Sequence, residues 1–187
     1  MKRRAVLAAG AAVVLATAAL LAWQTTRPAR LPDLALETID GRKLHLHGMA
    51  PAVLVNFWAS SCRPCMEELP HLARLYEQLR PRGLEVIGVA VSYDPPIQVV
   101  HTAKVRRIPY PVVSDVTGSI ARGFGMRRPA TPVFFLLDGR GNVVDQFFGR
   151  PDWQALRRQI DRLLDRTPAR GHGRPFRPSI AHAIDGS

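Results

Sequence analysis

The chain is poor in cysteine, with only Cys62 and Cys65 among 187 residues. Because there is no second cysteine pair, a structural zinc site made of four thiolates is excluded. No internal repeat is apparent, and the length fits one domain once both ends are set aside. Any thiol chemistry must therefore take place between two cysteines that stand three residues apart.

The central part of the chain also lacks an excess of charge. The net charge is +11, but residues 1–30 hold five positive and no negative side chains, and residues 166–187 hold four against one. Residues 31–165 are close to balance, with 17 against 14. No basic stripe interleaved with aromatic residues stands out there, so we expect no nucleic-acid partner.

The N-terminus is typical of export. A basic cluster at residues 2–4 precedes the uncharged run from Ala5 to Trp23. Its length lies between that of a cleavable signal peptide and that of a membrane-spanning helix of roughly 20 residues. We expect a single-pass anchor in the inner (cytoplasmic) membrane with the domain on the periplasmic, extracytoplasmic side. Cleavage near Ala16-Thr17-Ala18, which would leave a soluble periplasmic protein, is the alternative.

The remaining chain divides by composition. The predicted segments are a signal anchor or signal peptide at 1–23, a linker at 24–31, a folded domain at 32–165 and a disordered basic tail at 166–187. The tail is rich in Arg, Gly, Pro and His and has no apolar periodicity. Export would place the cysteines in a compartment where disulfides persist.

Apolar patterns within the domain predict alternating strands and helices. The expected strands are 53–58, 84–91, a short one ending at 113, 133–137 and 143–148, and the expected helices are 62–80, 97–106, 118–124 and 152–164. Residues 32–36 and 43–47 flank an Asp-Gly turn and predict a hairpin. The fold class is therefore α/β, a central mixed β-sheet flanked by helices, with an extra N-terminal β-hairpin.

The segment from Val53 to Cys65 predicts a buried strand, a short turn and the start of a helix. At the helix N-terminus, Cys62 meets unpaired N–H groups and the positive end of the helix dipole, which favour its thiolate. Arg63 adds a positive charge, and Pro64 fits the first helical turn. We expect Cys62 to be the nucleophile and Cys65, one turn further on, to resolve the mixed disulfide.

Cys-x-x-Cys is also a metal-ligand spacing. A structural zinc site would need two further ligands, which His45 and His47 could in principle supply. We expect no metal and no cofactor. A copper or zinc metallochaperone that uses the same cysteines stays open as the alternative function.

Several motifs together resemble the thioredoxin superfamily, and more closely its membrane-anchored TlpA/ResA-type branch. They are Phe57-Trp58-Ala59-x-x-Cys62-x-Pro64-Cys65, Pro32-Asp33-Leu34, Glu68-Leu69-Pro70, Thr131-Pro132 and Leu137-Asp138-x-x-Gly141. The resemblance covers about residues 31–165. It implies a thioredoxin-like fold and a redox-active disulfide between the two cysteines.

The resemblance also implies roles for individual residues. Thr131-Pro132 matches a loop with a cis peptide bond that faces the cysteines and pairs with an extended substrate. Glu68 matches an acidic residue that could carry the proton of the resolving thiol. Trp58 is expected to pack beside the site, with contact to substrate as a second role, and Arg63 and Pro64 complete the expected substrate contacts.

Two positions depart from the wider superfamily. Asn56 stands where general thioredoxins have a buried Asp, which fits the TlpA/ResA-type branch and makes a role for Glu68 more attractive. Ser61 stands where most relatives have an aromatic residue, so the rim around Cys62 should be smaller and more polar.

The resemblance implies a monomeric protein-disulfide reductase. Its substrates would be disulfides in exported proteins, such as apocytochrome c or copper-site assembly proteins. Its electrons would come from a DsbD/CcdA-like membrane donor. Peroxide reduction on a related fold is disfavoured because the Thr-x-x-Cys setting is missing.

Overall fold

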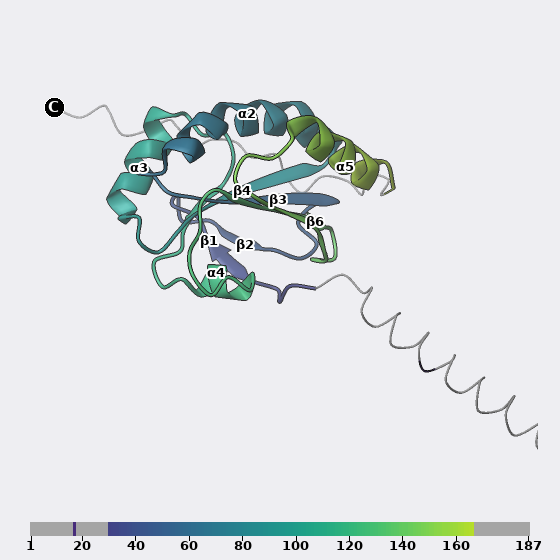
Figure 1. The fold of residues 1–187 in the computed structure, drawn as a ribbon, viewed down its shortest axis with the longest axis horizontal. Coiled ribbons are helices and arrows are strands. Elements are labelled where there is room, and N and C mark those ends of the chain that lie inside the picture. The colour runs from purple at the N-terminus through teal and green to yellow at the C-terminus, as the bar shows by residue number, and fades with distance from the viewer. Residues whose placement is uncertain (1–16, 18–29, 167–187) are drawn as a thin grey trace, which may run out of the picture.

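The computed structural model describes residue 17 and residues 30–166 (Figure 1). Nearly all of the predicted signal segment and of the basic tail, and most of the linker, lie outside this part. Among the described residues, no helix combines the length and the apolar character that crossing a membrane would require.

A five-stranded sheet forms the centre of the domain, in the order β5-β4-β3-β6-β7. Its strands are β3 (Ala52–Trp58), β4 (Leu84–Ala90), β5 (Val112–Ser114), β6 (Val133–Asp138) and β7 (Val143–Phe148). β3 pairs in parallel with β4 and antiparallel with β6. The predicted mixed sheet is confirmed, and its central strand β3 is buried at every position.

Three helices cover one face of the sheet (Figure 1). They are α2 (Arg63–Leu79), continued by the 3₁₀ turn η1 (Arg80–Arg82), α3 (Pro96–Val105) and α5 (Trp153–Arg166). Asp152 caps α5, because its carboxylate accepts from the N–H groups of Gln154 and Ala155.

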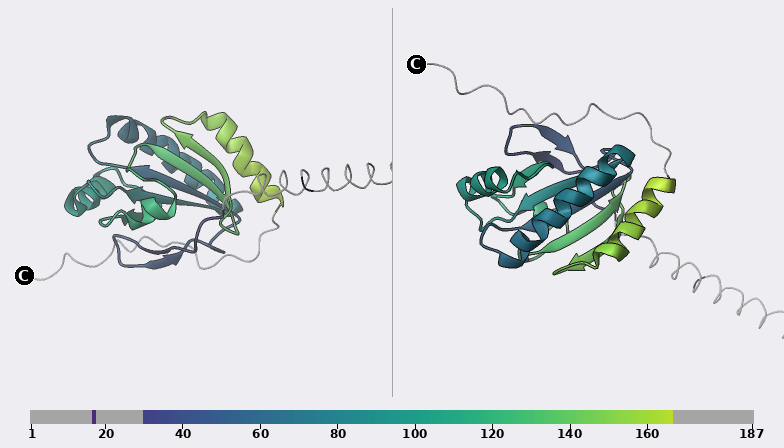
Figure 2. Two further views of the ribbon diagram at one scale, coloured as in Figure 1. Left: turned by 60° about the horizontal axis from the view of Figure 1, so that its bottom comes forward. Right: turned by 90° about the horizontal axis from the view of Figure 1, so that it is seen from above.

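The opposite face carries the short helix α4 (Ser119–Gly123) and the N-terminal hairpin (Figures 1 and 2). The hairpin strands are β1 (Ala35–Glu37) and β2 (Lys43–His45), joined by a turn in which Gly41 has φ +79°. Positive φ at this position suits glycine, which lacks a Cβ. The N–H of Ile39 donates to Val112 at 2.8 Å and so attaches the hairpin to the edge strand β5.

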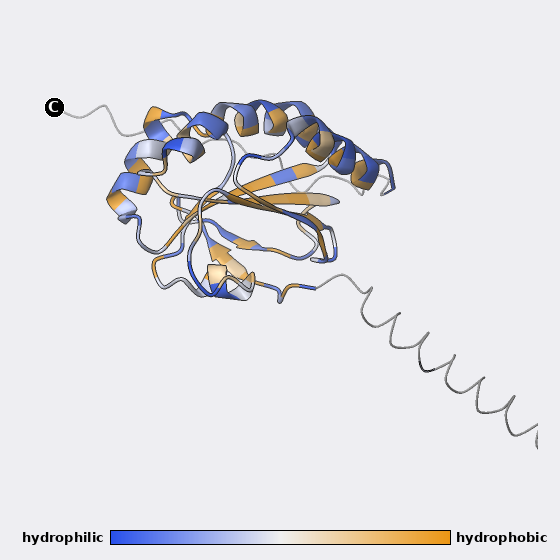
Figure 3. Cartoon of the chain, in the orientation of Figure 1, coloured by the Kyte–Doolittle hydropathy of each residue, from blue (hydrophilic) through white to orange (hydrophobic). Residues whose placement is uncertain are grey.

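Hydrophobic residues dominate the strands of the sheet, which are mostly orange in Figure 3, and their side chains enter buried clusters on both faces. Alternate residues of β3 enter different clusters: Val53, Val55 and Phe57 face the hairpin side, and Leu54 faces α2 and α5. A fully buried apolar side chain of this size contributes roughly 1.5–3 kcal/mol. The end of β3, where the cysteine turn begins, is therefore anchored from both sides.

Candidate active site at the disulfide

A tight turn carries the chain from β3 into α2. The N–H of Cys62 donates to the carbonyl of Ala59 at 3.1 Å, and Cys62 is the N-cap of α2. Cys62 and Cys65 form a disulfide with their Cα atoms 5.2 Å apart. The N–H of Cys65 donates to the sulfur of Cys62 at 3.2 Å. In the reduced pair, the same donor would stabilise a thiolate at Cys62.

The two sulfur-bearing residues differ in access. Cys62 is partly exposed, whereas Cys65 is 1% exposed and belongs to a buried cluster with Trp58 and Ala90. An incoming sulfur from another protein can therefore reach Cys62 and not Cys65. This difference agrees with the predicted roles of nucleophile and resolving thiol.

The loop before β6 lies at the same end of the sheet. Thr131-Pro132 has the cis peptide bond that was predicted. Val133 pairs with Phe57, so Pro132 stands beside the end of β3, where the cysteine turn starts. The hydroxyl groups of Thr131 and Tyr93 are hydrogen-bonded at 3.1 Å. The loop after β4, which contains Tyr93, thus contacts the loop that precedes β6.

Asp94 is a site residue that the sequence reasoning missed. Its carboxylate is buried and accepts from the N–H of Ser60 at 2.6 Å and from the Ser60 hydroxyl at 2.5 Å. Ser60 stands two positions before Cys62, so Asp94 fixes the turn that presents the nucleophile. The signal for Asp94 in the sequence was a single acidic residue between a predicted strand and two prolines.

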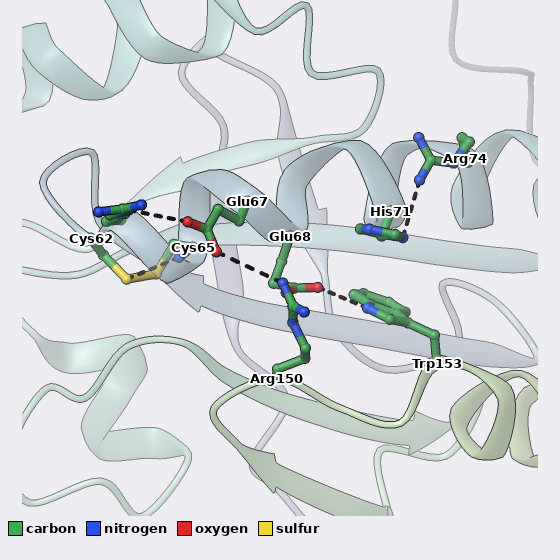
Figure 4. A network of polar contacts seen from close by, with 9 residues as sticks. Cys62, Cys65, Glu67, Glu68, His71, Arg74, Arg150 and Trp153 are labelled. Atoms are coloured by element: carbon green, nitrogen blue, oxygen red, sulfur yellow. Dashed lines mark hydrogen bonds and ion pairs between the residues drawn. A yellow bond between two sulfur atoms is a disulfide. The ribbon is translucent and has the colours of Figure 1, made fainter.

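Glu68 is buried, but its carboxylate is already engaged (Figure 4). One oxygen accepts from Nε of Arg150, and the other accepts from Nε1 of Trp153 at 2.7 Å. Arg150 also lies 3.8 Å from Glu67. Sequence reasoning found neither of the two donors to Glu68, and the proton-carrying role of Glu68 stays a prediction.

Arg63 and Pro64 are exposed beside Cys62. Nε of Arg63 lies 3.2 Å from a carboxylate oxygen of Glu67, one turn along α2. Both residues are placed where an incoming protein could touch them. Their role as substrate contacts remains a prediction.

Trp58 has no exposed surface and packs with Cys65 and Val99. A substrate cannot contact a side chain that is wholly buried, so the predicted contact with Trp58 is wrong and its packing beside the site is confirmed. Asn56 is also buried, and Ser61 is exposed next to Cys62. The rim therefore has no aromatic ring at position 61.

The two histidines considered as zinc ligands have other partners. Nδ1 of His45 lies 3.5 Å from Asp33, and Nε2 of His47 lies 2.9 Å from the carbonyl oxygen of Leu31. The backbone N–H of His47 also donates to Asp33 and holds the pKa of that carboxyl below its usual range. Within residues 30–166, no group of three or more His, Cys, Asp or Glu side chains is placed to hold a metal ion.

Comparisons with known proteins agree with this geometry. A sequence profile of the AhpC/TSA family matches residues 29–146. Thiol-disulfide oxidoreductase ResA from Bacillus thuringiensis subsp. konkukian is 26% identical over 133 residues, which are 71% of this chain and 75% of that protein.

Two solved structures are similar in fold. A thiol:disulfide interchange protein of the thioredoxin family from Chlorobium tepidum TLS is 29% identical with a TM-score of 0.65, over 74% of this chain and 98% of that one. The structure of MTB dsbF is 26% identical with a TM-score of 0.62, over 74% of this chain and 99% of that one.

Proposed function

The chain belongs to the AhpC/TSA family, and from this premise we propose that it is a thiol–disulfide oxidoreductase that reduces disulfides in exported proteins. The observation that carries the proposal is the unequal access to the two cysteines. Cys62 is open to a partner, and Cys65 is enclosed behind it. Such an arrangement suits exchange through one sulfur and release through the other.

The proposed reaction consists of two successive thiol–disulfide exchanges. The Cys62 thiolate attacks one sulfur of a substrate disulfide, which forms a mixed disulfide and expels the other substrate sulfur as a thiolate. The Cys65 thiolate then attacks Sγ of Cys62, which closes the Cys62–Cys65 disulfide and releases the second substrate thiolate. The substrate gains two electrons, and the enzyme loses two. A dithiol donor must then reduce Cys62–Cys65 again.

The N-terminal sequence supports a proposed location of the protein in the cell. A basic cluster and an uncharged run ending at Trp23 support an inner-membrane anchor with the domain on the periplasmic side. We propose that the domain is a monomer. We propose a DsbD/CcdA-like membrane protein as the dithiol donor. Apocytochrome c and copper-site assembly proteins are the proposed substrates, because their free cysteines are needed for haem or copper attachment.

The test is to trap the exchange intermediate in the native host. In Cys65→Ser the second exchange cannot occur, so we expect full-length protein to accumulate in disulfide-linked adducts with exported proteins. Dithiothreitol should release these adducts. Cys62→Ser is the matched control, since it keeps one cysteine but removes the accessible one.

The contrary result would favour the metallochaperone. Suppose that Cys65→Ser gives no more adducts than Cys62→Ser, while the reduced wild-type protein binds one copper(I) ion tightly. The reductase proposal would then be rejected.

A further inference from the structure

Two aromatic side chains are exposed near the disulfide. Among the described residues, Tyr93 (54% exposed) and Phe148 (70%) are the exposed large aromatic side chains. An exposed aromatic ring is an efficient contact surface for another protein, because it offers a large apolar area with few rotatable bonds. Both residues lie next to the loop at Thr131-Pro132.

Tyr93 is held on one side of this loop. Its hydroxyl is bonded to the Thr131 hydroxyl, and the adjacent Asp94 is bonded to Ser60. The backbone of Tyr93 is thus tied to the cysteine turn, and its side chain is tied to the loop opposite. The phenol ring is positioned before any substrate arrives.

Phe148 is held on the other side. It pairs with Val133 across the β6–β7 ladder, and the N–H of Gly149 donates to the carbonyl of Pro132 at 2.9 Å. Its neighbour Phe147 packs in the cluster under α2 and α5. Because successive side chains in a strand point to opposite faces, Phe148 projects away from those helices.

Sheet topology orders these groups along one edge. β3 and β4 end there, β6 begins there, and β7 returns to it because β7 is antiparallel to β6. Across the order β4-β3-β6-β7, the edge therefore presents Tyr93, the cysteine turn, Pro132 and Phe148. In this strand order, the cysteine turn stands between the loop that carries Tyr93 and the end of β7 that carries Phe148.

We propose that Tyr93 and Phe148 are specificity-determining residues that hold the substrate segment across Cys62. The occupant is an extended segment of an exported protein with large apolar side chains on both sides of its reacting cysteine. This inference rests on the proposed reductase function, since the sulfur exchange is what brings a partner to this edge. Ser61 leaves the approach to Cys62 open between the rings.

The experiment compares two synthetic peptides that contain the same intramolecular disulfide. One has Leu on both sides of the attacked cysteine, and the other has Ser. Reduced full-length protein in detergent is expected to reduce the Leu peptide about tenfold faster, as for one well-packed apolar anchor. Tyr93→Ser and Phe148→Ser should each remove most of this preference, whereas Tyr93→Phe should keep it.

Two controls separate recognition from folding and redox chemistry. Val144→Ser changes an exposed apolar residue at the opposite end of β7 and should leave the preference unchanged. Reduction of each variant's own disulfide by dithiothreitol should proceed at the wild-type rate, because that small thiol needs neither ring.

The outcomes distinguish the two proposals. If the wild-type protein reduces both peptides at the same rate, or if both serine variants keep the preference, Tyr93 and Phe148 do not determine specificity. If the wild-type protein reduces neither peptide nor any protein disulfide, the reductase function itself is wrong, and the inference is rejected with it.

Discussion

Glu68 and Asp94 are two buried carboxylates beside the cysteine turn, and the chain holds them in different ways. Glu68 accepts from the cationic Arg150 and from the indole of Trp153. Asp94 accepts only from the backbone and hydroxyl of Ser60, and no ion pair in the described part of the chain includes it. One carboxylate is matched by a charge, and the other by neutral dipoles.

The two carboxylates support different cysteines. Glu68 fixes α2, which carries the resolving Cys65, to Arg150 before α5 and to Trp153 at the start of α5. Asp94 fixes the turn that presents Cys62. Because no ion pair within residues 30–166 offsets Asp94, its negative charge opposes a thiolate at Cys62, while the helix N-terminus favours one. We therefore expect the site to be more sensitive to the loss of Asp94, beside the nucleophile Cys62, than to the loss of Glu68.

The largest effect should follow from Asp94→Ala. This change leaves the N–H of Ser60 without its acceptor, and hydrogen bonds to a charged group contribute about 1.5–3 kcal/mol. We expect the unfolding free energy of the oxidised protein to fall by about 3 kcal/mol in urea titrations. Asp94→Asn keeps one acceptor oxygen and should lose about half as much.

Ser60→Ala is the matched control, because it removes one hydrogen bond and keeps the charge of Asp94. Asp94→Asn should shift the equilibrium with glutathione toward the dithiol form, since a thiolate at Cys62 then meets less negative charge. Ser60→Ala should shift it less. Equal shifts in the two variants would mean that the charge of Asp94 does not affect the redox equilibrium of the cysteines.

A smaller loss of unfolding free energy is expected when Glu68 or its partner Arg150 is replaced, and the two replacements should differ. Arg150→Gln leaves a buried carboxylate without its cation, and we expect a loss of about 2 kcal/mol in the same titration. Glu68→Gln should cost about 1 kcal/mol, because Arg150 is 63% exposed and stays solvated. The double variant should cost less than the sum of the two. The reverse order of the single variants would contradict the comparison.

Local chemistry explains what the sequence could predict. The cap at Asp152, the turn at Gly41 and the cysteine-bearing start of α2 each depend on residues within a few positions of one another. The strand patterns also predicted the mixed sheet. The cis bond before Pro132 followed from the family resemblance and not from local chemistry.

Long-range partners could not be predicted in this way. The bonds of Glu68 join residues 82 and 85 positions apart, and those of Asp94 join residues 34 apart. Nothing in the local sequence around Trp153 indicates that its indole donates to Glu68. Only the packing of α5 beside α2 brings that donor to its acceptor.

Glu85 supplies the smallest test, because it is a half-buried carboxylate whose loss of hydration outweighs the groups that favour its charged form. It lies on β4, where the N–H of Val86 donates to it at 3.3 Å, and Tyr76, Arg80 and Arg42 also favour its charged form. Burial raises the pKa of Glu85 above the ordinary value of 4.5. The folded state thus favours the protonated form of Glu85.

The sign of the pH dependence follows from this difference. The stability that Glu85 contributes is fully present below pH 4.5 and is lost as pH rises through its higher folded pKa. At pH 7 the ionised carboxylate is therefore a liability, and Glu85→Gln should raise the unfolding free energy by at most about 0.5 kcal/mol. At pH 4 the variant should show no gain. A loss of stability at pH 7 would mean that the folded protein favours the charged form of Glu85 instead.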